Sequence, residues 1–210
     1  MDDRLPLFPL GLVLLPGEPV PLHIFEPRYR EMVALCLRED RPFGIVYTSE
    51  TAGMAQVGTT AWIRRVVTRY DDGRLDIVVV GETRFRLRSV HRDKAYITAD
   101  VAPIEDEPAA PDEAAVRERV VTQHMKLVEM AGEEVRPDLY EPPPAVSFIV
   151  GRNAGLELEQ KQEMLEMPRE GDRLEFLAAH FAGIIKRVRR AKQLHDLSRG
   201  DGHASGPPEL

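Results

Sequence analysis

The chain has 210 residues, which is enough for one large domain or two small ones with a sizeable core. Its 43% hydrophobic and 30% charged residues are typical of an ordinary globular protein. The net charge of −7 argues against binding of polyanions over the whole surface, although a local basic patch remains compatible with it. The single cysteine, Cys36, excludes an internal disulfide framework and a thiolate metal cluster.

The first feature along the chain is an apolar run at residues 5–15. A secretion signal would need a positively charged flank and a small-residue cleavage site, whereas the flank here is MDDR and the run is broken by Pro6 and Pro9. The run is also too short to span a bilayer. We therefore expect two short buried strands, 5–7 and 11–14, in a cytoplasmic protein without a membrane segment.

The elements that follow are mostly strands. The pattern predicts a strand at 20–25, a helix at 27–39 that begins with a proline, and a strand at 43–48. Asp-Asp-Gly at 71–73 lies between two runs rich in β-branched residues, which predicts a hairpin. A last strand is expected at 96–104. Residues 1–104 thus predict six or seven strands and one helix, in a small barrel or curved sheet.

The predicted helix carries Cys36 on its apolar face. Tyr29, Met32 and Val33 fall on the same face at helical spacing. No neighbour would activate the thiol as a nucleophile, so we expect a buried structural cysteine.

Basic residues alternate with apolar ones in the second strand of the predicted hairpin. Arg84, Arg86 and Arg88 alternate with Phe85 and Leu87, which predicts one basic and one buried face. Such a face could attract a nucleic-acid backbone. Acidic residues interleave with the arginines and an aromatic stacking platform is missing, so the sequence disfavours this alternative.

The second half of the chain changes character. A linker rich in Pro, Ala and acidic residues is expected at 106–114, followed by helices at 113–131, 145–150, 160–167 and 172–197. The predicted fold is therefore α+β, with a β module followed by a helical bundle at 113–197. Residues 198–210 are rich in Gly, Pro and small residues and are expected to be a disordered tail.

Motifs for chemistry are missing from the sequence. It contains no phosphate-binding glycine loop, no Gly-x-Gly-x-x-Gly and no His-Glu-x-x-His. The six histidines are scattered without metal-ligand spacing, and the five serines lack a nucleophile-elbow motif. We therefore expect no catalytic residue, no metal and no cofactor. An enzyme whose site the sequence does not display stays an alternative.

Several long motifs carry a family resemblance. LPLFPLGLVLLPGEPVPLHIFEPRYREMV, FGIVY, VGTTAWIRRV, GRLDIVVVGETRFRL and, in the helical half, LEQKQEMLEM and DRLEFL resemble the N-terminal substrate-binding domain of the ATP-dependent protease Lon. The resemblance implies a PUA-like β subdomain, here 1–104, followed by a helical bundle. It also implies recognition of unfolded or tagged polypeptides, with self-association as a further expectation. In Lon, an ATPase module and a protease module follow this domain, whereas the present sequence contains motifs for neither. We therefore expect a stand-alone, non-catalytic bacterial relative.

Three places for binding follow from these expectations. An extended peptide could add to an exposed sheet edge, or lie in a groove between the β module and the bundle. The corner between the strand at 20–25 and the first helix offers aromatic and charged groups together: His23, Phe25, Glu26, Arg28 and Tyr29. The alternatives are that Phe25 and Tyr29 belong to the core and that Glu26 and Arg28 form a local ion pair.

Overall fold

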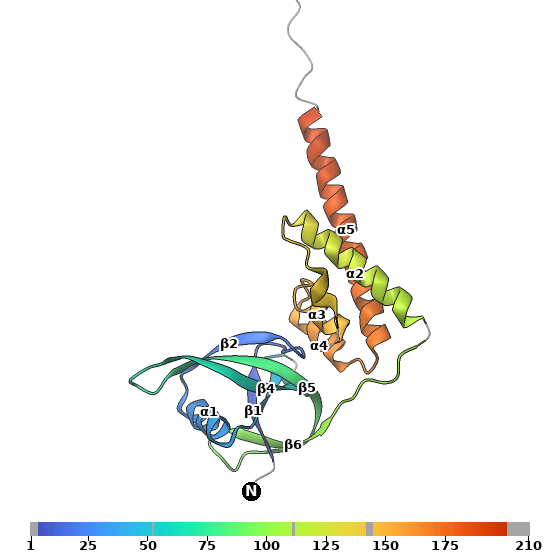
Figure 1. Cartoon of the computed structure of the whole chain (residues 1–210). Helices are drawn as coiled ribbons and strands as arrows, with labels where there is room; N and C mark the ends of the chain where they lie inside the picture. The colour runs from blue at the N-terminus through green and yellow to red at the C-terminus, as the bar shows by residue number, and fades with distance from the viewer. Residues whose placement is uncertain (1–3, 52, 111, 142–144, 201–210) are drawn as a thin grey trace, which may run out of the picture.

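The structure is a computed structural model that describes residues 4–51, 53–110, 112–141 and 145–200, with side chains described as far as Arg190. A curved sheet with helix α1 lies at one end, and helices α2 to α5 gather at the other (Figure 1). The end of α5 projects beyond the other helices. In the part of the chain that the structure describes, no helix is both long and apolar enough to cross a membrane.

The sheet has six strands in the order β2-β5-β4-β3-β1-β6. Their bounds are β1 Leu5–Leu10, β2 Pro19–Ile24, β3 Phe43–Ser49, β4 Gly53–Arg69, β5 Leu75–His91 and β6 Ile97–Pro103. All pairs are antiparallel except β1–β3. The long strand β5 pairs with β2 and β4 and also with β6, and its ladders contain register shifts that increase curvature. The prediction of a curved sheet is confirmed.

The apolar N-terminal run folds differently from the prediction. A single strand spans Leu5–Leu10, and residues 11–14 are not a strand, so the predicted second strand there is wrong. The reason is burial on two sides. Val13 and Leu15 pack into the core of the helical half, whereas Leu14 packs into the core between the sheet and α1. This segment is apolar because it connects two cores, and that requires no sheet pairing.

Helix α1 spans Pro27–Glu39 as predicted, and its C-cap residue, Asp40, has the left-handed conformation. It buries Tyr29, Met32, Val33 and Cys36 against the sheet. Burial also raises the pKa of the Cys36 thiol to about 11. The predicted burial of this cysteine is confirmed, and its thiol stays protonated at neutral pH.

The helical half contains α2 Glu113–Met130, the 3-10 helix η1 Pro137–Tyr140, α3 Val146–Gly151, α4 Leu158–Glu166 and α5 Glu170–Gly200. The four α-helices match the prediction, but η1 does not appear in it because its four residues are too few to show a helical period. Helix α5 continues to Gly200, so residues 198–200 are helical rather than part of the expected tail. The remainder of that tail lies outside the described residues.

Candidate polypeptide-binding surfaces

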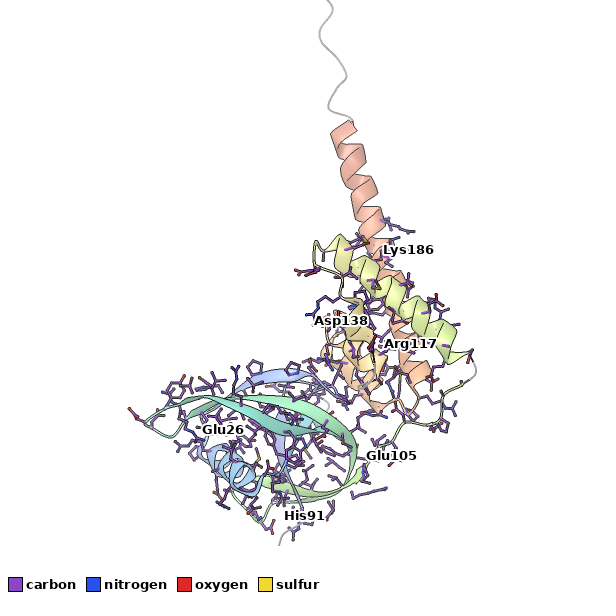
Figure 2. The ribbon with its side chains drawn as sticks, viewed as in Figure 1. Glu26, His91, Glu105, Arg117, Asp138 and Lys186 are labelled. Atoms are coloured by element: carbon purple, nitrogen blue, oxygen red, sulfur yellow. The ribbon has the colours of Figure 1, made fainter. Side chains whose placement is uncertain are left out.

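The first candidate surface is the predicted corner between β2 and α1, marked by Glu26 in Figure 2. Asp76 on β5 accepts hydrogen bonds from His23 (Nδ1–Oδ1, 2.6 Å) and from the hydroxyl of Tyr70 (2.7 Å). These two hydrogen bonds lower the pKa of Asp76, and the bond from His23 has the larger effect. The ring of His23 stacks on Phe25 with centroids 5.9 Å apart. His23, Phe25, Tyr70 and Asp76 therefore form one exposed aromatic and charged group.

The other corner residues divide between surface and core. Phe25 is 59% exposed, whereas Tyr29 is 6% exposed and packs against Phe8 with ring centroids 4.1 Å apart. The alternative that both are core residues thus describes Tyr29 and not Phe25. Glu26 and Arg28 form the expected local ion pair (Nε–Oε2, 2.8 Å). Arg28 also lies over the Tyr29 ring, 4.5 Å from its centroid.

The nearby sheet edge is β2, which ends the strand order. The N–H of Gly81 donates to the carbonyl of Glu18, so Glu18 directs its backbone toward β5. In an antiparallel pair every second residue does the same, and in β2 these residues are Val20, Leu22 and Ile24. Pro19 and Pro21 then lie in the opposite phase and have no N–H to offer at the open edge. Proline at an edge prevents strand addition, so a peptide is not expected to extend the sheet at these positions.

The prediction of a basic face on β5 is wrong for one of its three arginines, Arg84. Arg86 and Arg88 are exposed, but Arg84 is 3% exposed and does not belong to a solvated face. The alternation places Arg84 and Arg86 on the same side of the strand, and the helical half covers that side at Arg84. Its Nη1 donates to the carbonyls of Leu165 and Met167, each at 2.7 Å.

Arg84 instead belongs to a buried ionic junction between the sheet and the helices. Arg84 and the fully buried Arg173 both bond to the carboxylate of Asp106, and Arg173 also contacts Glu170 (2.8 Å). The ring of Phe148 lies 4.4 Å from the Arg173 guanidinium and 5.5 Å from that of Arg84. Burial lowers the pKa of Arg84. The predicted linker thus contributes Asp106, whose acidic side chain compensates two buried arginines.

Arg84 and Asp106 of this junction also line the predicted groove between the two halves. A cavity of about 270 Å³ lies there, lined by Glu82, Thr83, Arg84 and Asp106 together with apolar groups such as Phe148. The charges of Arg84 and Asp106 are already paired with each other. Half of the lining residues are charged or polar, so the cavity is a poor receptor for an apolar segment.

A second, larger groove lies within the helical half, near Asp138 in Figure 2. Its volume is about 530 Å³, and it is bounded by α2, the segment 131–140, the turn after α3 and α5. Its apolar lining includes Leu127, Ala131, Leu139, Ala154, Phe181 and Ile184. A volume in this range is typical of sites that bind small ligands or a few side chains. The sequence predicted the helices at 113–131 and 172–197 that bound the groove, but not the segment 131–140 that completes it.

One side of this groove is formed by His124 and Tyr140. The Nδ1 of His124 lies 2.7 Å from the hydroxyl of Tyr140, and its ring stacks on Phe181 with centroids 5.7 Å apart. Burial lowers the pKa of His124, so the imidazole is neutral at pH 7. The interior of the groove therefore carries no charge from this side chain.

Among residues 4–51, 53–110, 112–141 and 145–190, no group of three or more His, Cys, Asp or Glu side chains is arranged to hold a metal ion. The expectation of no metal came from the spacing of the histidines, and it stays a prediction.

Two solved structures share this arrangement of a curved sheet followed by helices. The Lon N-terminal domain protein from Xanthomonas campestris has a TM-score of 0.64 at 26% identity, over 84% of this chain and 98% of that one. The N-terminal domain of the Mycobacterium avium complex Lon protease has a TM-score of 0.71 at 20% identity, over 86% and 98%. The fold is thus the α+β fold of Lon N-terminal domains.

The sequence itself then defines the family. The model of the ATP-dependent protease La (LON) substrate-binding domain matches residues 4–181, and this chain belongs to that family. Lon protease 2 of Syntrophobacter fumaroxidans is 24% identical over 93% of this chain, and the Lon protease of Paraburkholderia phytofirmans is 27% identical over 95%. The match covers 26% of each of these two relatives, so the chain spans about a quarter of their length.

Proposed function

We propose that this chain is a non-catalytic polypeptide-recognition module that binds exposed apolar segments of unfolded or tagged proteins. The observation that carries the proposal is the open apolar groove of about 530 Å³ in a member of a substrate-binding domain family. The exposed aromatic corner around Phe25 is a second contact surface in this proposal.

The chemistry of the groove supports binding without turnover. Its lining is mainly apolar, and its partly buried polar pair, His124 and Tyr140, has no serine, cysteine or lysine within the described lining to activate. In this proposal the chain contributes binding, and any hydrolysis of peptide or ATP belongs to other modules. The β subdomain (1–104) and the helical subdomain (113–197) act as one body, because the junction at Asp106 connects them.

The test uses the full chain and a permanently unfolded, fluorescently labelled client. Fluorescence anisotropy is expected to report saturable binding, and neither the client nor ATP is expected to be hydrolysed. Phe25→Ser tests the corner, and Val67→Ser is its control, because Val67 is a similarly exposed apolar side chain (53%) that does not belong to the corner group. Failure of the wild-type chain to bind any unfolded client would refute the proposal, as would turnover of that client.

A further inference from the structure

The rim of the helical groove carries an unbalanced negative charge. Glu133 and Glu134 both line the groove and are exposed. Within the described part of the chain, neither carboxylate has a hydrogen-bonding or ion-pair partner. The cation of the rim, Arg136, is already paired with Asp138 (3.0 Å). The entrance is therefore acidic, although it leads to an apolar interior.

The interior supplies one kind of contact and the rim another. Leu127, Leu139 and Ile184 offer apolar surface, and Leu139 is 50% exposed. Burying such surface is favourable in proportion to its area. The neutral His124 adds no charge that would oppose a cation at the rim.

A third contact is available at the turn after α3. Asn153 lines the groove and is exposed, and its side-chain amide has no hydrogen-bonding partner in the described structure. An amide both donates and accepts, as a peptide backbone does. Asn153 is therefore placed to bond the main chain of a segment whose side chains enter the groove.

From these contacts we infer that the groove selects apolar segments that are flanked by lysine or arginine, with the apolar side chains inside and the cation at Glu133 and Glu134. This inference rests on the proposed function and specifies its substrate class. The argument for this occupant is charge complementarity, because an acidic rim around an apolar interior attracts a cationic flank and repels an acidic one.

The experiment compares three labelled peptides that share one apolar core and differ only in their flanks, which are lysine, glutamate or serine. Binding to the full wild-type chain is measured by anisotropy. The lysine-flanked peptide is expected to bind about tenfold more tightly than the glutamate-flanked one at low salt, and this ratio is expected to shrink as salt is added. The serine-flanked peptide should fall between them.

Glu133→Lys with Glu134→Lys is expected to remove or invert this preference while the serine-flanked peptide still binds. Glu31→Lys with Glu163→Lys is the matched control, because it changes the net charge equally at exposed positions outside the groove. The control should keep the wild-type preference. Leu139→Ser should weaken the binding of all three peptides, since it removes exposed apolar surface from the groove.

The outcomes separate the two proposals. Equal affinity of the wild-type chain for lysine and glutamate flanks would overturn the inference and leave polypeptide recognition standing. The absence of binding to every peptide and to an unfolded client would overturn both. A dimer of the wild-type chain in sedimentation that Leu139→Ser dissociates would also overturn the inference, because a second copy would then be the occupant of the groove.

Discussion

The buried junction and the exposed corner are both built from charged and aromatic groups, yet their surroundings give them opposite roles. At the junction, Arg173 is fully buried and Arg84 nearly so, and their charges are compensated by Asp106. At the corner, the side chains of His23 and Asp76 are 44% and 33% exposed. Charges that are desolvated must be paired for the protein to fold, whereas solvated ones contribute little and are free to serve binding.

The largest expected effect is at the junction. Asp106→Ala leaves two buried guanidinium groups without their shared carboxylate, and it is expected to lower the free energy of unfolding by roughly 3 kcal/mol. Urea denaturation of the full chain measures this loss. Asp138→Ala is the control, because the Asp138–Arg136 pair is exposed and its removal should cost less than about 1 kcal/mol. Equal losses in the two variants would contradict the distinction.

A smaller loss of stability is expected from a substitution in the β4–β5 hairpin turn, which lies between Tyr70 and Asp76 of the corner. Gly73 has φ = +85°, and a Cβ there would lie 3.0 Å from Nη1 of Arg30. Gly73→Ala is therefore expected to cost about 1–2 kcal/mol of unfolding free energy. Gly11→Ala is the control, because a Cβ at Gly11 would meet no atom within 4 Å and its φ is not positive. The same denaturation assay should find Gly11→Ala nearly neutral, and a large loss there would contradict the geometric argument.

The partly buried His124 in the groove is expected to make the stability of the protein depend on pH. Because burial lowers the pKa of His124, the unfolded chain takes up a proton below about pH 6.5 that the folded chain resists. Stability is therefore expected to decrease as pH falls through this range, and to stop decreasing below the folded pKa. Thermal unfolding between pH 5 and 8 measures the slope. His124→Gln should have the shallower slope, since the other histidines are common to both proteins, and parallel slopes would contradict the assignment.

The smallest effect on stability is expected at the corner itself. Asp76→Asn removes the charge that His23 and Tyr70 contact, but all three side chains are solvated. The urea midpoint should stay within experimental error of wild type. A shift comparable to that of Asp106→Ala would mean that the corner is structural, and that its role in binding has to be reconsidered.

Local patterns predicted most of the fold, and burial by distant elements accounts for what they missed. Pro27 and the helical spacing of Met32 and Cys36 were enough to predict α1, and Asp-Asp-Gly was enough for the β4–β5 turn. The position of Arg84 was not predictable, because the alternation along a strand gives the side on which it lies and not what covers that side. Asp106 is a similar case: within a stretch of acidic residues, nothing local indicates the one that pairs with arginines far away in the sequence.

The candidate sites show the same limit. The corner could be predicted because its residues are adjacent in the sequence, and the structure places Phe25 and His23 together there. The groove combines α2, the segment 131–140, the turn after α3 and α5. Only tertiary structure brings these parts together. A repeated apolar stripe on α2 and α5 signals that the helices pack, but it does not indicate that the packing leaves an open groove at one end.

The most direct test of polypeptide recognition by this fold is amide hydrogen exchange of the full chain with and without a saturating unfolded client. The account predicts added protection in the second half of α2, in residues 131–140 and in the turn at 153–155, with the junction unchanged. Protection that is absent from all of these segments, or that is confined to β1, β3 and β6, would contradict the account.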